Sequence, residues 1–232
     1  MYERKHYLNT SADPNDAYIT RKGFWFHVDG ALGAAYAPFL QMAHRNGLTE
    51  LAPPPTFDFR LDFVSSIVTS GHKWIGAPWP CGIYISKTEF QLRPPEKAQI
   101  SYFESSDLTL AGSRNAHSAL ALWSYISTYS YEEQARRAIE ALESALYAEQ
   151  RLKELEAEIK QDLWVMHSPS SLAVRFKRPN EKISRKYCLS GCWLHINGKW
   201  RQYVHIYTIS GAMKRSKIDE LIENLRAPGA FN

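Results

Sequence analysis

Two side chains able to act together on a carbonyl compound stand at the ends of apolar segments. Lys73 lies within SGHKWIG (70–76), directly after an apolar run, and Asp29 ends the apolar run at 24–28. A lysine amine stripped of its hydrating water becomes a nucleophile toward carbonyl carbons. The small residues of GALGAA (30–35) would let a flat ligand lie close to the backbone beside Asp29, and its carboxylate could pair with a protonated ring nitrogen.

Each of these residues also has a plainer interpretation when it is taken alone. Lys73 could extend from a strand end into water. Asp29 could cap the following helix. His27 and His72 flank the two residues and could be ordinary packed histidines. The two histidines remain candidates only because they adjoin Asp29 and Lys73.

The elements that would position Asp29 and Lys73 are two buried strands. The runs at 24–28 and 66–68 are continuously apolar rather than alternating, which is typical of a sheet covered on both faces. The carboxyl ends of parallel strands meet at one edge, where open α/β sheets bind ligands. A lysine for a Schiff base and an aspartate for a pyridinium nitrogen are the two protein groups that a pyridoxal cofactor needs.

The remaining pattern predicts the rest of a large domain and a small α+β domain. We expect a partial large domain at 1–130, a linking helix at 131–160 and the small domain at 161–232. The amphipathic period of the linking helix is its main signal, and Asn197-Gly198 predicts a hairpin. The further expected elements are a strand at 82–86, a helix at 113–129, strands at 163–168 and 172–177, a helix at 180–189, strands at 192–197 and 202–209, and a helix at 214–226.

Composition excludes several classes of protein. The 232 residues carry a net charge of +4 and no basic block, so we expect neither nucleic-acid nor membrane binding. The N-terminus lacks an apolar signal core, which predicts a cytoplasmic protein. Three cysteines favour a reducing compartment. Cys188, Cys192 and His195 lack a further ligand pair, so no metal site is expected.

Three segments together resemble a known family. FHVDGALG (26–33), SGHKWIGAPWPCG (70–82) and DLTLAGSRNAHSALALW (107–123) are similar to the group II pyridoxal-phosphate-dependent amino-acid decarboxylases. They look most like the histidine decarboxylase branch, which plant serine decarboxylases share. The resemblance is strong over residues 20–130 and extends to the C-terminal part only in layout. It implies an α/β protein with the fold of type I pyridoxal-phosphate-dependent transferases, here a partial large domain with a mostly parallel sheet and a small α+β domain.

The resemblance also implies roles for individual residues. Lys73 would form the Schiff base with pyridoxal 5′-phosphate, and Asp29 would keep the pyridinium nitrogen protonated. Ala31 would pack against the cofactor ring. Ser70 and His72 would reach the phosphate.

Further candidates depend on the same resemblance. His27 is one of them. Ser113 and Arg114 belong to the run 112–115, which would lie near a dimer interface and the cofactor phosphate. Gly30 departs from the alanine that is common in the family.

The implied activity is decarboxylation of an L-amino acid, histidine or serine, to the amine and CO₂. Family chains are longer, and we expect the missing part upstream of Phe24. The active form would then be a homodimer or would need a partner carrying the N-terminal half, and this chain alone would fold poorly or associate. Two alternatives stay open: an inactive fragment that acts by association, and another pyridoxal-phosphate lyase or aldehyde synthase.

Overall fold

The structure is a computed structural model that describes residues 25–90, 99–100, 105–106, 114–209 and 213–231. The chain divides into two compact units, one comprising 1–35 and 55–128 and the other 36–54 and 129–232. In the described residues no helix is both long and apolar enough to cross a membrane.

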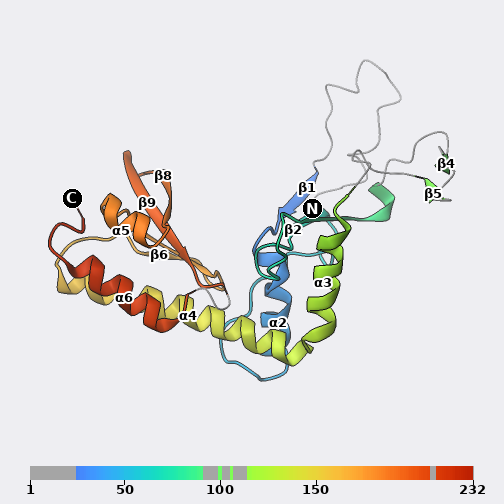
Figure 1. Ribbon diagram of the computed structural model, residues 1–232, viewed down its shortest axis with the longest axis horizontal. Coiled ribbons are helices and arrows are strands. Elements are labelled where there is room, and N and C mark those ends of the chain that lie inside the picture. The colour runs from blue at the N-terminus through green and yellow to red at the C-terminus, as the bar shows by residue number, and fades with distance from the viewer. Residues whose placement is uncertain (1–24, 91–98, 101–104, 107–113, 210–212, 232) are drawn as a thin grey trace, which may run out of the picture. The chain divides into compact units, whose positions relative to one another are not determined.

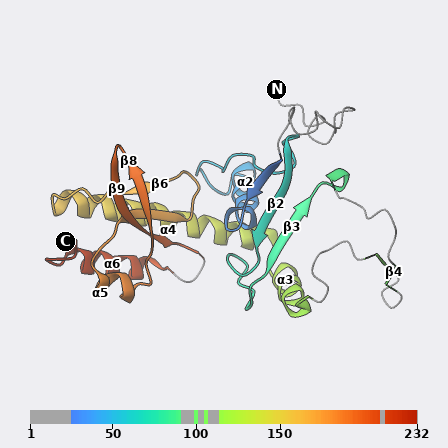
Figure 2. The same ribbon diagram turned by 90° about the horizontal axis from the view of Figure 1, so that it is seen from above.

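The first unit is built on a three-stranded sheet of order β1-β2-β3 (Figures 1 and 2). β1 (Phe26–Asp29) and β2 (Val64–Ser70) are parallel, as predicted. β3 (Gly82–Ser86) runs antiparallel to β2, because the short connection at 71–81 contains no helix that could cross over to a parallel position. The paired strands β4 (Gln99–Ile100) and β5 (Ser105–Ser106), short 3-10 turns at Gly33–Ala35 and Thr88–Phe90, and the helix α3 (Ala116–Thr128) complete the described part of this unit.

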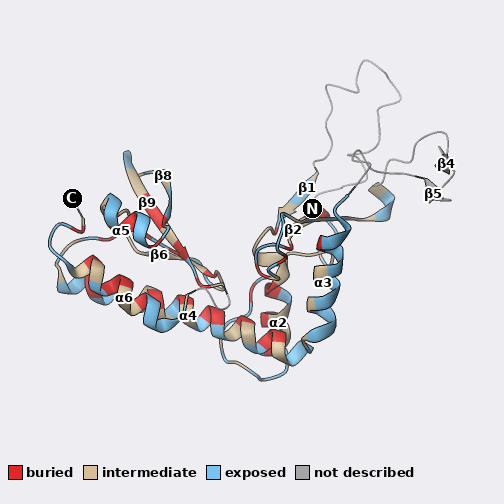
Figure 3. Cartoon of the chain, viewed as in Figure 1, coloured by how far each residue is buried: buried red, intermediate tan, exposed pale blue. Residues whose placement is uncertain are grey.

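Burial in this sheet is uneven (Figure 3). The first four residues of β2 are buried, whereas β1 and β3 are largely exposed. Among the described residues β1 pairs only with β2, so its other edge has no strand beside it. The expectation that both faces of β1 are covered is therefore not met within the described residues.

The second unit holds an antiparallel sheet of order β6-β7-β9-β8. Its helices pack into one hydrophobic core with Val174, Phe176, Val204 and Ile206 of the sheet. Alternate residues of a strand point to opposite faces, so the helices cover one face of this sheet. The elements are α4 (Tyr131–Glu158), β6 (Met166–His167), β7 (Ala173–Lys177), α5 (Glu181–Lys186), β8 (Ser190–Ile196), β9 (Lys199–Tyr207) and α6 (Arg215–Arg226).

Two details of this unit differ from the sequence-based expectation. α2 (Ala37–Arg45) packs against α4, which places residues 36–54 with the C-terminal unit rather than with the first. The strand expected at 163–168 is reduced to β6, because Trp164 has a φ of 55°, which an extended strand cannot contain. The predicted hairpin at Asn197-Gly198 is present, and both residues have positive φ.

Candidate functional site

The predicted site residues gather where β1 and β2 end. Asp29 is paired with Val68, and both strands finish at the same edge of the sheet. Two backbone hydrogen bonds join the segments that follow: Gly30 N donates to Val68 O and Ser70 N donates to Ala31 O, each at 3.0 Å. Asp29, Ala31 and Ser70 are thereby fixed next to one another.

Asp29 is exposed at this edge and is only partly engaged. Its Oδ1 accepts a hydrogen bond of 3.1 Å from Ala31 N, a local contact that orients the carboxylate at the strand end. Within the described residues no donor contacts the second carboxylate oxygen. That oxygen is available to a protonated nitrogen of a ligand.

Lys73 lies in the turn that follows β2, three residues beyond the strand end, and its N donates to Ser70 O at 3.3 Å. The side chain is exposed, and it makes no hydrogen bond or ion pair with the part of the chain that the structure describes. The apolar neighbours of Lys73 suggested that its side chain is buried. The buried side chain of this turn is instead that of Trp74, which is 4% exposed. Adjacent residues of the turn point in different directions, so the tryptophan anchors the turn and leaves the amine outside.

His72 is held by the backbone of Cys81. Its Nδ1 lies 2.9 Å from Cys81 N, which can only donate. Cys81 O already accepts from Gly71 N at 2.8 Å. Nδ1 also lies 3.2 Å from Cys81 O, but because Cys81 N can only donate, Nδ1 is the accepting nitrogen. No described residue bonds Nε2, so this nitrogen can donate to an anionic group.

His27 occupies the same sheet face as Asp29, two residues further from the strand end. Its Nδ1 lies 2.7 Å from Ser66 Oγ, and its ring stacks on that of Tyr84 on β3 at a centroid distance of 6.1 Å. Sequence reasoning did not identify Ser66, Tyr84 or Cys81 as neighbours of the site. Because side chains alternate between the two faces of a strand, the positions of Ser66 on β2 and Tyr84 on β3 could have indicated that they lie beside His27. No sequence signal indicated that Cys81 contacts His72.

The start of α3 lies near the turn that carries Lys73. The ring of His117 meets that of Trp79 edge to face at 4.5 Å. Asn115 caps the helix, accepting from His117 N at 3.0 Å. Arg114 is exposed just before this cap, and the predicted site residue Ser113 lies outside the described residues.

The donor set at the two strand ends fits a pyridoxal cofactor. In the described ranges no group of three or more His, Cys, Asp or Glu could hold a metal ion. An exposed amine with no described partner and a carboxylate with one available oxygen stand at the ends of two bonded parallel strands. These are the two groups that such a cofactor requires.

Comparison with known sequences places the chain among related proteins. Residues 13–167 match a family described as "Pyridoxal-dependent decarboxylase conserved domain". The histidine decarboxylase of Morganella morganii is 33% identical over 211 residues, which are 91% of this chain and 48% of that protein. The corresponding protein of Pseudomonas entomophila is 33% identical over 90% of this chain and 45% of its own length. The chain thus spans about half the length of these relatives.

Solved structures show the same relationship. L-methionine decarboxylase from Streptomyces sp. 590 is 42% identical, with a TM-score of 0.80 over 91% of this chain and 44% of its own. The glutamate decarboxylase of Lactobacillus brevis, at 18% identity, has a TM-score of 0.66 and shows the fold alone. These likenesses confirm the predicted fold class.

Proposed function

The chain belongs to the pyridoxal-dependent decarboxylase family, and from this premise we propose that Lys73 and Asp29 hold pyridoxal phosphate for the decarboxylation of an L-amino acid. The observation that carries the proposal is the meeting of the two strand ends. Asp29 ends β1, Lys73 follows β2, and the bond from Ser70 N to Ala31 O ties the two segments together. Open α/β sheets bind their ligands at this kind of edge.

Each residue has a separate task in this proposal. The Lys73 amine would hold the carbonyl carbon of the cofactor, and its Nζ would be placed to deliver a proton to the substrate Cα. Asp29 keeps a proton on the ring nitrogen through its available oxygen. Pyridoxal phosphate, when bound, supplies the conjugated ring that accepts the electron pair left by departing CO₂.

Neighbouring residues complete the proposed site. His72 donates from Nε2 to the phosphate, because Cys81 N occupies Nδ1. Ser70 adds a hydroxyl at the end of β2, and Ala31 presents a small side chain to the ring. Arg114 and Ser113 are proposed to lie near the phosphate as well. Histidine is our first substrate, since the relatives named above include histidine decarboxylases. Methionine follows from the Streptomyces enzyme, and serine from the branch resemblance.

The first test asks whether the chain holds the cofactor at Lys73. Purified protein is mixed with pyridoxal phosphate, reduced with borohydride to fix any lysine adduct, and mapped by mass spectrometry. We expect the adduct on Lys73 and its loss in Lys73→Ala, whereas Lys182→Ala, which removes an exposed lysine of α5, leaves it unchanged. Adducts spread over the surface lysines would contradict the proposed site.

The second test measures CO₂ release from histidine, methionine and serine. Asp29→Asn should keep the Lys73 adduct and lower CO₂ release on the order of 100-fold, as removal of one positioned electrostatic partner does elsewhere. The exposed position of Lys73, and the edge of β1 that pairs with no strand among the described residues, favour a second candidate. In that case this chain acts only by association, and the adduct forms without CO₂ release from any of the three amino acids.

A further inference from the structure

On one face of the sheet in the second unit, basic side chains lie close together. Its strands β6 to β9 contain four Lys or Arg residues and no Asp or Glu. Register pairs Arg175 with His205 and Lys177 with Tyr203 on β9, and Lys199 and Arg201 lie on the same side of that strand. Because side chains alternate between faces, all four cations share one face. We call these four residues and that face the cationic face.

The cationic face is opposite the hydrophobic core. Val204 and Ile206 alternate with Tyr203 and His205 along β9 and pack with the helices. In the part of the chain that the structure describes, Arg175, Lys177, Lys199 and Arg201 make no ion pair or hydrogen bond through their side chains. Four neighbouring cations without carboxylates repel one another and favour an anionic ligand.

Aromatic contacts fix part of this face in place. Arg201 lies over the Trp164 ring at 4.9 Å and Lys177 over the same ring at 5.5 Å. The Trp164 ring also contacts Tyr203, which is 1% exposed. Cation–π contacts hold the two charges without neutralising them. Beside Arg175, a hollow of about 80 Å³ is lined by Met166, His167, Ser168, Ser171 and Ala173.

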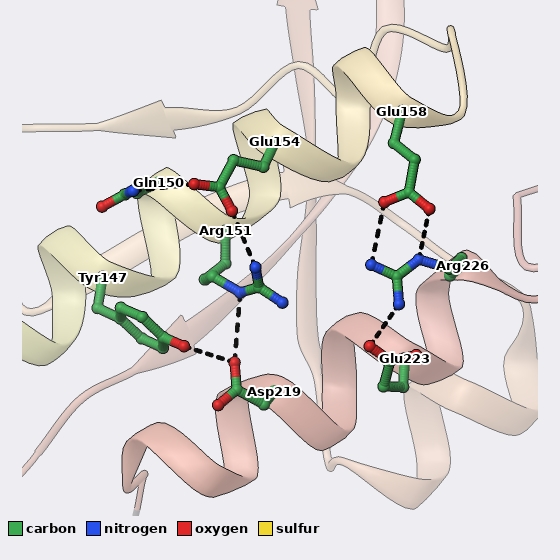
Figure 4. A network of polar contacts seen from close by, with 8 residues as sticks. All are labelled: Tyr147, Gln150, Arg151, Glu154, Glu158, Asp219, Glu223 and Arg226. Atoms are coloured by element: carbon green, nitrogen blue, oxygen red, sulfur yellow. Dashed lines mark hydrogen bonds and ion pairs between the residues drawn. The ribbon is translucent and has the colours of Figure 1, made fainter.

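Several acids of the same unit form ion pairs within its helical layer. Between α4 and α6, Arg226 pairs with Glu158 and Glu223, and Arg151 pairs with Glu154 and Asp219 (Figure 4). On α6, Glu220 pairs with Lys186 and Lys217 in the same way. In the described residues, none of the carboxylates of this helical layer forms an ion pair with the cationic face.

We propose that the cationic face binds a short acidic polypeptide segment in extended conformation. Arg175 and Lys177 are two residues apart on β7, and Lys199 and Arg201 are two residues apart on β9. That spacing, about 6.6–6.8 Å along a strand, is also the spacing of alternate carboxylates in an extended peptide. The proposal does not depend on the cofactor site, which belongs to the other unit.

Charge complementarity favours an acidic segment over two other ligands, a long polyanion and a second copy of this unit. A long polyanion would extend past the four cations, and the net charge of the whole chain is only +4, so there is little further positive charge to hold it. A second copy of the unit has no Asp or Glu on its strands, so its strands cannot present alternate carboxylates at the spacing of an extended segment. A short segment rich in Glu or Asp meets only the cationic face.

The test uses a fluorescent peptide of alternating Glu and Ser, with an alternating Gln and Ser peptide as its neutral control. Anisotropy at low salt should show binding of the acidic peptide alone. Lys177→Gln with Arg201→Gln should weaken binding about tenfold, the effect of losing two modest ion pairs. Arg136→Gln with Lys182→Gln removes the same charge from exposed helical positions and should change binding less than about twofold.

Chemical cross-linking of the unaltered chain tests the same proposal without substitutions, so that misfolding of a variant cannot explain the result. Carbodiimide joins carboxylates to lysines in contact, so the bound acidic peptide should cross-link to Lys177 and Lys199 and not to Lys182 or Lys186. Cross-links spread evenly over the lysines, or equal weakening by both double variants, would overturn the proposal. Tighter binding of a DNA oligonucleotide of equal charge, or self-association that the face variant abolishes, would overturn it as well.

Discussion

At the scale of single residues, Gly30 shows how closely the turn after β1 is packed. A Cβ at this position would lie 2.5 Å from Ala34 Cβ and 3.0 Å from Val68 O. Ala34 Cβ is attached directly to the backbone and cannot rotate away. Glycine therefore permits the bonds that join the two strand ends, and the alanine expected from the family resemblance would not fit this turn without a shift.

Gly30→Ala should lower the free energy of unfolding by about 1–3 kcal/mol, the usual cost of overpacking. Adding Ala34→Gly removes the shorter contact and should recover part of the loss. Gly33→Ala is the matched control, because a Cβ there meets nothing within 4 Å. Urea denaturation measures all three, and a Gly30→Ala chain as stable as Gly33→Ala would refute the packing argument.

Residue-level prediction succeeded where it rested on strand geometry. Asp29 and the segment that carries Lys73 were expected at one edge of a parallel sheet, and β1 and β2 are parallel and end at the same edge. The exposure of Lys73 could not be predicted, because the direction of a side chain in a turn depends on which neighbour, here Trp74, finds a cavity to fill. The roles of these residues toward a cofactor stay predictions.

At the scale of elements, β6 is joined to α4 by a buried polar contact. His167, whose side chain is 3% exposed, places Nδ1 2.8 Å from Glu149 Oε2 and Nε2 2.8 Å from Ser171 O. Burial opposes ionisation of Glu149, but hydrogen bonds from Lys153 and His167 outweigh it and lower the pKa of this carboxyl below its ordinary value of 4.5. The ionised carboxylate thus stabilises the folded unit.

Glu149→Gln should lower the free energy of unfolding by about 1–3 kcal/mol at neutral pH, because a charged hydrogen-bond acceptor is lost. A carboxyl whose pKa is lower in the folded state contributes stability above pH 4.5 and loses it as the pH falls through the folded value. The difference from the unaltered chain should therefore shrink below about pH 4.5. Glu154→Gln, at an exposed position, is the control, and a pH-independent difference in urea melts would contradict this account.

Element prediction was accurate where local signals were strong. The long helix was expected at 131–160 and spans Tyr131–Glu158, with Ser130 accepting from Glu133 N as its cap. The hairpin followed from Asn197-Gly198. The antiparallel direction of β3 and the packing of α2 against α4 were missed, because they depend on contacts between distant segments rather than on local pattern.

At the scale of the whole molecule, the first unit leaves large apolar side chains in water. On α3, which is largely exposed in Figure 3, three large apolar residues recur at helical spacing. Leu120, Trp123 and Ile126 are 58%, 65% and 61% exposed. The edge of β1 is bare within the described residues. Exposed apolar side chains on a helix and an unpaired strand edge are each a liability in a monomer, and the chain spans about half the length of its relatives.

The purified chain should consequently associate, and light scattering after gel filtration should report a mass above the 26.6 kDa of one chain. Trp123→Gln with Ile126→Gln should shift the population toward the monomer, because it removes two of the three large exposed apolar side chains of α3. Leu48→Gln changes a comparably exposed but separate leucine, 51% exposed, and should leave the distribution unchanged. A monomeric, cooperatively melting unaltered chain would show that the exposed apolar side chains of α3 are tolerated in water, and equal effects of both variants would show that these side chains are not the site of association.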